Sequence, residues 1–333
     1  MCKAFNNNQN FNAYNPLVSI VVPVFNVEDY IEESIKSICN QTYKPIEIIV
    51  VDDESKDSSI LTAKKVLEEY RVNYKIIHQM NKGLPGARNT GLLESNGQYV
   101  CFIDSDDILA EDHIKNAVIS LNKKEKACYS DFELTNDKNR EGKKTFFEGQ
   151  DFLDQEELFR LFSERRIKIH CCSILADRLF LIDNQIFFNE KLRYGEDVDF
   201  MWRLFSKTKG IVHVRQNSYK YLQRKNSIMT TAALDKWFIF IDEFHETISN
   251  LKQTYPEYIE VYSYVYYRTL LGLMNTAARN CYIEEYLMLC KKINTNKMKY
   301  YLSKSVDVRT RVAAFLIKYD KCYYYLIHAI KVL

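Results

Sequence analysis

The most regular feature of the chain is a series of short, continuous apolar runs separated by segments with helical spacing. The runs are LVSIVVPVF (17–25), IEIIVVDD (46–53), YKIIHQ (74–79) and YVCFID (99–104). Apolar runs of this length, rich in Val and Ile, are typical of strands that are buried on both faces. The sequence therefore predicts a sheet whose central strands are covered on both sides.

Helical periodicity fills the connections between these runs. Asn26 is a candidate N-cap for the first helix, and residues 57–70 carry the second. Residues 84–95 predict a weaker third helix, because Pro85 is tolerated only in its first turn and Gly91 costs about 1 kcal/mol relative to alanine. The alternation of strand and helix predicts right-handed crossovers and a mostly parallel sheet of the α/β class.

The pattern changes further along the chain. Residues 194–207 have helical spacing and residues 211–222 resemble a strand, whereas the chain beyond about residue 232 predicts successive amphipathic helices. The last helix carries an apolar stripe made of Val312, Phe315, Leu316, Tyr319, Tyr323, Leu326, Ile327 and Ile330. Two interpretations stay open. The stripe packs on other helices, or, with the basic residues around it, it faces an anionic membrane surface or a lipid-linked acceptor.

Composition narrows the class of protein only a little. The hydrophobic content of 47% supports a sizeable core, and the net charge of +2 gives no reason to expect nucleic acid as a partner. The nine cysteines include no C-x-x-C pair, which favours reduced thiols. Residues 4–27 are Asn-rich and interrupted by Pro16 and Pro23, so they predict neither a signal peptide nor a membrane span. We expect a cytoplasmic protein.

Polar residues follow three of the predicted strands at their carboxyl ends, where open parallel α/β sheets bind their ligands. These are the residues from Pro23 to Asn26, the pair Asp52 and Asp53, and the cluster 104–107 with sequence DSDD. Neither G-x-G-x-x-G nor G-x-x-x-x-G-K-[ST] occurs, and only nine glycines are present, so a glycine-rich phosphate cradle is not expected. A divalent cation held by carboxylates is the alternative. A simpler interpretation is that one of these aspartates caps a helix beginning near Ala110.

The chain resembles the inverting family 2 glycosyltransferases, which have the GT-A fold and include enzymes of bacterial cell-surface polysaccharide synthesis. The motifs that carry the resemblance are residues 18–57, NKGLPGARNTGL (81–92), FIDSDD (102–107), GEDVDF (195–200) and YLQRKNSIM (221–229). The resemblance implies a nucleotide-sugar donor, a divalent metal ion such as Mn²⁺ or Mg²⁺, and transfer with inversion. The resemblance covers roughly residues 17–230. With the helical pattern that follows it, we expect a flexible tail at 1–16, a GT-A catalytic domain at 17–231 and a helical subdomain at 232–333.

The same resemblance assigns roles on the donor side. Asp53 would accept a hydrogen bond from the base, which favours uracil, and Asp106 would bind the metal. Asp107 would be a helix cap or support its neighbours. The remaining donor-binding residues implied are Pro23, Val24, Asn26 and Glu28 at the base and ribose, Lys82 and Arg88 on the nucleotide side, and Asp104 near the ribose. Two departures from the family pattern, Glu54 in place of Gly and the pair Pro85-Gly86, put the shape of these loops in question.

A second pair of carboxylates, Glu196 and Asp197, lies in the first turn of the helix predicted at 194–207. Acidic residues there are commonly explained by the helix dipole alone. With the other motifs present, we expect Asp197 to be the general base that takes the acceptor proton, and Glu196 to orient it or contact the acceptor. Arg224 and Lys225 are either an exposed basic pair or a loop that closes over the diphosphate.

The histidines show no metal-ligand spacing, and a structural role is expected for each; His213 is the only one near the motifs. Two other classes of protein remain as alternatives to a glycosyltransferase that uses a UDP-sugar and a glycan or lipid-linked acceptor. A sugar-nucleotide pyrophosphorylase should carry a glycine-rich basic loop where this chain has PVFNVE. A non-catalytic nucleotide-sugar-binding protein would not need both Asp106 and Asp197.

Overall fold

The structure of the protein is a computed structural model that describes residues 15–121, 125–136, 139–145, 147, 149–223, 234–305, 307–317, 323–324 and 327. Ten strands form one sheet: β1 (Val18–Val24), β2 (Ile46–Asp52), β3 (Tyr74–His78), β4 (Tyr99–Phe102), β5 (Ile108–Leu109), β6 (Ala127–Asn136), β7 (Asn139–Lys144), β8 (Phe152–Asp154), β9 (Ile174–Asp177) and β10 (Gly210–Gln223). The order along the sheet is β3-β2-β1-β4-β9-β6-β10-β5, with β7 paired to β6 and β8 to β10.

The first four strands are parallel, as predicted. β1 lies between β2 and β4, and all seven of its residues are buried, as are those of β2. The direction changes at β9, which is antiparallel to both β4 and β6, while β10 runs parallel to β6. The sheet is therefore parallel in its N-terminal half and mixed in the other half. The turn between β4 and β5 lies at the carboxyl ends of the parallel strands, and from it the chain continues into the mixed half of the sheet.

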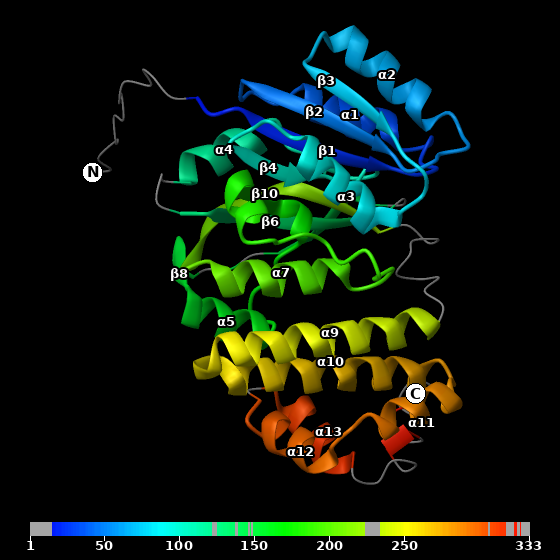
Figure 1. Ribbon diagram of the computed structural model, residues 1–333, viewed down its shortest axis with the longest axis vertical. Helices are drawn as coiled ribbons and strands as arrows, with labels where there is room; N and C mark the ends of the chain where they lie inside the picture. The colour runs from blue at the N-terminus through cyan, green and yellow to red at the C-terminus, as the bar shows by residue number, and fades with distance from the viewer. Residues whose placement is uncertain are drawn as a thin grey trace.

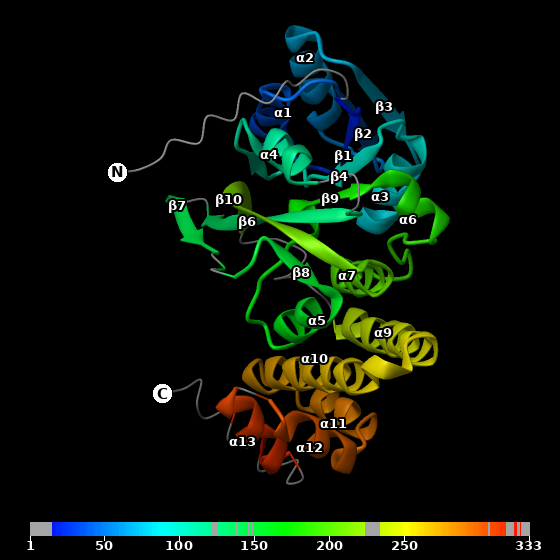
Figure 2. The same ribbon diagram turned by 90° about the vertical axis from the view of Figure 1, so that its left-hand side faces the viewer.

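Helices cover the sheet and extend away from it: α1 (Ile31–Cys39), α2 (Ser59–Tyr70), α3 (Gly83–Glu94), α4 (His113–Ser120), α5 (Gln155–Ser163), α6 (Arg178–Asp183), α7 (Glu196–Lys207), α9 (Leu234–Thr254), α10 (Ile259–Arg279), α11 (Ile283–Lys291), α12 (Thr295–Ser303) and α13 (Val308–Leu316), with short 3-10 turns η1 (Cys171–Ser173) and η2 (Pro256–Tyr258). α3 packs on β1 and β2. α7 lies beneath the mixed half of the sheet, α9 packs on α7, and α10 packs on α9 and α5, with α11 to α13 below (Figures 1 and 2).

Two local predictions were wrong, and one short strand was not predicted. Asn26 is not an N-cap: it has a φ of 51°, and α1 begins five residues later, after Tyr30. The helix predicted near Ala110 begins at His113 behind the N-cap Asp112, so no aspartate of 104–107 caps it; β5 occupies Ile108–Leu109 in between. The pattern missed β5 because a strand of two residues has too little periodicity to be recognised.

The C-terminal stripe is divided in the structure. Val312 and Phe315 are more than half exposed on α13, whereas Tyr323 is buried. Tyr319, Leu326 and Ile330 lie outside the described residues. A single core-facing stripe is therefore wrong for α13. In the described part of the chain, no helix combines the length and the apolar character needed to cross a bilayer.

The proposed domain limits stay predictions. The residues before Asn15 and the segment 224–233, in which the boundary at 231–232 falls, lie outside the described residues. What the structure does show is contact across that boundary. The ring of Phe240 on α9 lies close to the backbone of Gly195, the residue before α7. The C-terminal helices therefore support the helix that carries Glu196 and Asp197.

Candidate active site

Arg88, on α3, is at the centre of the candidate site. Its guanidinium is only 1% exposed, donates to Asp104 Oδ1 at 2.6 Å, and donates to Glu196 Oε1 at 3.3 Å. The ring of Phe188 lies under it, 5.0 Å from the guanidinium carbon. The resemblance to the family predicts that Arg88 lies on the nucleotide side of the site. In the structure it links the two carboxylate groups that the sequence singled out, which are separated by ninety residues of chain.

The first carboxylate group lies in the turn between β4 and β5. Asp107 N–H donates to the carbonyl of Asp104 at 3.0 Å, which closes the turn. Burial would raise the pKa of Asp104, but the adjacent Arg88 charge holds that pKa below its ordinary value. Asp106 is half-buried between these two residues. The turn thus gathers three carboxyl groups within four residues of chain.

Asp107 is fully buried, and of its two predicted roles, a helix cap or support for its neighbours, its contacts fit the second. Its Oδ2 accepts from the hydroxyl of Tyr219, and its Oδ1 accepts from Leu222 N–H at 2.8 Å. Burial, and then the charges of Asp106 and Asp104, raise its pKa well above the ordinary value. Asp107 therefore anchors the turn to β10, just before the segment that begins at Arg224.

The second carboxylate group begins α7. Gly195 has a φ of 76°, and a Cβ there would lie 2.4 Å from the ring of Phe240, so glycine is required on both grounds. Burial, and then the charge of Asp197, raise the pKa of Glu196 to about 7. Asp197 Oδ1 accepts from Val198 N–H at 2.8 Å, and its Oδ2 has no hydrogen-bond partner among the described residues. A carboxylate with one committed oxygen and one open oxygen is suited to accept a proton.

The predicted base and ribose residues lie in two loops that are bonded to each other. Asn26 Oδ1 accepts from Lys56 N–H at 2.8 Å, and Glu28 Oε2 accepts from Ser58 N–H at 3.0 Å. Pro23 and Val24 are buried at the end of β1. The hydrogen bonds join the loop after β1 to the loop after β2, as a pocket built from both would require.

Glu54, which departs from the family's usual glycine, adopts the conformation that glycine favours. Its φ is 72°, a left-handed backbone that L side chains rarely adopt. Its side chain pairs with Lys56 at 2.9 Å and accepts from Asn81 N–H at 3.3 Å. The loop therefore has a backbone conformation suited to glycine, although the residue is glutamate.

Asp53 holds the start of α3. Its Oδ1 accepts from Lys82 N–H at 2.8 Å and from the Gln79 amide at 2.7 Å, and its Oδ2 accepts from Gly83 N–H at 2.8 Å. Lys82 is exposed, and its side chain lies against Gly86, where a Cβ would be 2.4 Å from Lys82 Cβ. Gly86 is thus explained by the close approach of Lys82. The base contact predicted for Asp53 stays a prediction. Arg224 and Lys225 lie outside the described residues.

Sequence reasoning missed His170. Burial would lower its pKa, but Cys172, Asp104 and Asp197 raise that pKa above the ordinary value, so the ring is close to both carboxylate groups. His213, the histidine that the sequence placed nearest to the motifs, is instead buried against Asp131, with 3.1 Å between Nε2 and Oδ2. No spacing signal could identify His170, because it reaches the site from the turn η1.

The carboxyl groups of the β4–β5 turn fit a hard divalent cation. They offer oxygen ligands, and a positive ion would relieve their mutual repulsion, which after burial is the next cause of the raised pKa of Asp107. A different group has donor atoms close enough together to hold a metal ion: those of His170, Cys171 and Cys172 lie within 4.8 Å of one another. Those thiols are buried, and Arg88 Nη2 lies 3.7 Å from Cys172 Sγ. Sulfur ligands suit soft metals, so this group does not fit Mg²⁺ or Mn²⁺.

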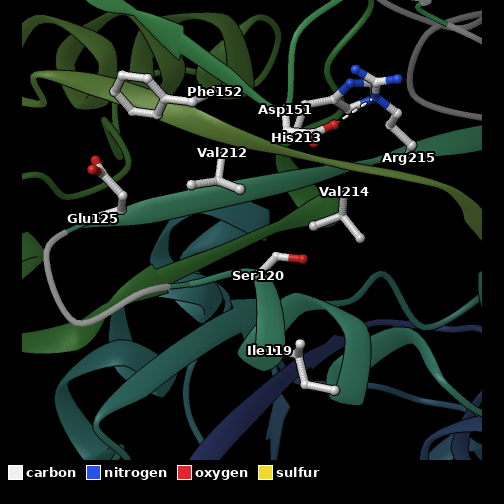
Figure 3. A pocket seen from close by; sticks show the side chains of 9 residues that line it. All are labelled: Ile119, Ser120, Glu125, Asp151, Phe152, Val212, His213, Val214 and Arg215. Carbon is white, nitrogen blue, oxygen red and sulfur yellow. Dashed lines mark ion pairs between the residues drawn. The ribbon is translucent and has the colours of Figure 1, made fainter. Parts of the chain in front are cut away.

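A separate cavity of about 480 Å³ lies away from these residues (Figure 3). It is lined by Ile119, Ser120, Glu125, Asp151, Phe152, Val212, His213, Val214 and Arg215. Two of its three charged residues, Arg215 and Asp151, pair with each other at 2.7 Å. None of the predicted site residues lines it, so the carboxylate groups around Arg88 remain the candidate site.

The chain belongs to glycosyl transferase family 2, whose model matches residues 19–181. Glycosyltransferase GlyG of Streptococcus pneumoniae serotype 4 is 30% identical over 224 residues, which are 65% of this chain and 73% of GlyG. Minor teichoic acid biosynthesis protein GgaB of Bacillus subtilis is 26% identical over 340 residues; the match takes in 97% of this chain but 36% of GgaB. The chain thus spans about a third of GgaB.

Among solved structures, S. aureus TarS 1-349 in complex with UDP-GlcNAc is similar in fold, with a TM-score of 0.69 at 19% identity. The match covers 94% of this chain and 90% of that chain. At this identity the likeness concerns the fold. Together these matches confirm the predicted family and the GT-A-like architecture with C-terminal helices.

Proposed function

We propose that the protein transfers a sugar, with inversion, from a nucleotide-sugar donor to a hydroxyl of a glycan or lipid-linked acceptor during cell-surface polysaccharide synthesis. The observation that carries the proposal is the pair of bonds from Arg88 to Asp104 and Glu196, at 2.6 and 3.3 Å. This bridge brings a donor-side and an acceptor-side carboxylate group together. The name of GgaB, a teichoic acid biosynthesis protein, supports the polysaccharide context.

On the donor side, we assign the nucleotide to the carboxyl ends of β1, β2 and β4. The proposed donor-binding residues are Pro23, Val24, Asn26, Glu28, Asp53, Lys82, Arg88, Asp104 and Arg224. UDP is the preferred nucleotide, since the TarS structure of similar fold is a complex with UDP-GlcNAc. Mn²⁺ or Mg²⁺ would be held by Asp106 and would neutralise the charge of the departing diphosphate.

On the acceptor side, Asp197 takes the proton from the acceptor hydroxyl as that oxygen attacks the anomeric carbon. The open Oδ2 of Asp197 supports this role. Glu196 accepts from Arg88 and holds the start of α7 toward Asp104. One base is sufficient for a single displacement, which is why inversion is the proposed outcome.

The alternatives are less well supported. A pyrophosphorylase needs no base such as Asp197, and a binding protein needs neither that base nor the arginine bridge that aligns it with the donor side. We further propose that the enzyme works at the inner face of the cell membrane. The exposed Val308, Val312 and Phe315 on α13 and the basic residues near them support contact with anionic lipid.

Calorimetry of UDP binding with and without Mn²⁺ tests the proposal. We expect Mn²⁺ to strengthen binding to the wild-type protein, and we expect Asp106→Ala to lose this enhancement together with sugar transfer. Asp151→Ala, which removes an exposed carboxylate paired with Arg215, is the matched control and should behave like wild type. If Asp106→Ala kept the metal enhancement, the assignment of the metal ligand would be wrong.

A further inference from the structure

His170 is held firmly at the edge of the candidate site. It precedes the turn η1, and its Nδ1 accepts from Cys172 N–H at 3.3 Å. Its carbonyl accepts from Ser173 N–H at 2.9 Å and from the Ser173 hydroxyl at 2.8 Å. Both the backbone and one ring nitrogen are therefore fixed by the turn.

Aromatic side chains from the sheet fix the orientation of the ring. The His170 ring lies 4.6 Å from Tyr221, 5.4 Å from Tyr219 and 5.7 Å from Phe132, measured between ring centroids. Tyr219 is itself anchored, since its hydroxyl donates to Asp107. A histidine clamped in this way is pre-organised, so a ligand that binds it does not have to order the side chain first.

The hydrogen bond at Nδ1 determines which nitrogen can donate. Because Nδ1 accepts from a backbone N–H, the neutral ring carries its proton on Nε2. Apart from the Cys172 side chain, the ring has no further hydrogen-bond partner within the described part of the chain, and the residue is half-buried rather than sealed from solvent. Among the described residues, no oxygen atom accepts the N–H that His170 presents.

The surroundings indicate what that donor meets. Tyr221, which packs on His170, has its pKa raised by burial and then by the charges of Asp107, Asp104, Asp106 and Asp197. The two rings thus lie between the donor-side and acceptor-side carboxylates. Arg88, the cation at the centre of the site, is already committed to Asp104 and Glu196. A diphosphate entering among these carboxylates needs further N–H donors.

We infer that His170 is a donor-binding residue whose Nε2–H donates to a diphosphate oxygen of the nucleotide sugar. The inference rests on the proposed function and adds a residue outside the motifs that define the donor site. A charged phosphate oxygen is a better acceptor than a sugar hydroxyl, since bonds to ionised groups are shorter and about twice as strong.

Two substitutions separate the N–H donor from the ring packing. His170→Phe keeps an aromatic ring against Tyr219 and Tyr221 but has no donor. His170→Gln keeps a side-chain amide donor and an acceptor for Cys172 N–H. The matched control is His245→Phe, which changes an exposed histidine on α9. Thermal melts identify any variant that does not fold.

Calorimetry with UDP and with uridine, both in the presence of Mn²⁺, is the measurement. We expect His170→Phe to weaken UDP binding roughly 10- to 100-fold, as loss of one hydrogen bond to a charged group predicts. Uridine binding should be unchanged, His170→Gln should recover most of the UDP affinity, and His245→Phe should match wild type.

Three outcomes would overturn the inference or its basis. Equal UDP affinity in His170→Phe and wild type would remove His170 from the diphosphate. An equal loss for uridine and UDP, or a loss seen only with an intact UDP-sugar, would place the residue at the nucleoside or the sugar instead. Absence of UDP binding by the wild-type protein would contradict the proposed donor itself, which is a different failure.

Discussion

The two carboxylate groups on either side of Arg88 are built in different ways. Asp107 in the β4–β5 turn is buried, and both of its oxygens accept from β10, through Tyr219 and Leu222. Asp197 at the start of α7 uses one oxygen within its own helix, and among the described residues its other oxygen has no partner. The proposed donor side is thus fixed to the sheet, whereas the proposed acceptor side keeps a carboxylate oxygen that could take a proton.

Arg88 ties these two unlike groups together, and the difference between them suggests a division of work. A metal and a diphosphate need fixed ligands, which the turn supplies through hydrogen bonds to β10. A general base needs an open oxygen and a supported position, which Gly195 and Phe240 supply by packing α7 on α9. The C-terminal helices therefore matter to the acceptor side more than to the donor side.

The largest expected effect tests the base. Asp197→Asn keeps the size of the side chain and its acceptor oxygen but cannot take a proton, so kcat should fall by roughly 10²- to 10⁴-fold. UDP affinity should stay nearly unchanged, because the donor side is intact. Steady-state transfer assays with calorimetry give both quantities. Near wild-type turnover of Asp197→Asn would show that Asp197 is not the general base, and would contradict the proposed division of roles between the two carboxylate groups.

Removing Arg88, which bridges Asp104 and Glu196, should destabilise the protein. Arg88→Met leaves Asp104 and Glu196 partly buried without their cation, which should lower the free energy of unfolding by about 3–5 kcal/mol. Urea denaturation followed by circular dichroism measures this. Lys36→Met, which breaks the exposed pair with Glu32, is the control and should change the free energy of unfolding little, because exposed ion pairs contribute little to stability. Similar losses in the two variants would show that the bridge is not structural.

The pKa of Glu196, raised to about 7, predicts a dependence of stability on pH. Between its ordinary value of 4.5 and about 7, the folded protein binds a proton at Glu196 that the unfolded chain has released. The stabilisation is complete below that interval and is lost as pH rises through it. Glu196→Gln should flatten the fall in unfolding free energy between pH 5 and 7.

Glu111→Gln, which changes an exposed carboxylate, is the control for that experiment. It should leave the slope of unfolding free energy against pH as in wild type. Urea titrations at three or more pH values measure the slope for each variant. A slope that is the same in Glu196→Gln and wild type would mean that other groups set the pH dependence. It would also remove the electrostatic contrast between Glu196 and the turn carboxylate Asp104, whose pKa lies below its ordinary value.

The sequence was sufficient for the features that depend on local pattern. The four parallel strands, the helix α7 and the acidic motifs at 104–107 and 196–197 follow from periodicity and from the resemblance to the family. Contacts between distant segments could not be predicted. Arg88 to Glu196 and Tyr219 to Asp107 each span more than a hundred residues. No local rule contains such pairs, because they exist only once the sheet has formed.

Local rules also failed where tertiary contacts compete with them. Asn26 has the chemistry of an N-cap, but its side chain accepts from Lys56 N–H in the neighbouring loop instead. His170 has no metal-ligand spacing in the sequence, and it reaches the site just before a turn of three residues. In both cases the deciding partner lies on another segment of the chain.

The smallest expected effect compares two left-handed residues, one on each side of the site. Glu54 on the donor side has a φ of 72°, and Gly195 on the acceptor side has a φ of 76°. Left-handed backbone costs a non-glycine residue about 1–2 kcal/mol, while glycine loses about 0.5–1 kcal/mol through chain entropy. Glu54→Gly should therefore raise the free energy of unfolding by at most about 1 kcal/mol, since the exposed pair with Lys56 contributes little. Gly195→Ala is the counterpart and should be clearly destabilising, because its Cβ would meet Phe240. Thermal melts of both variants measure the contrast. A destabilised Glu54→Gly would mean that the Glu54 side chain, through Lys56 and Asn81, holds the donor loop more strongly than its backbone strain opposes it.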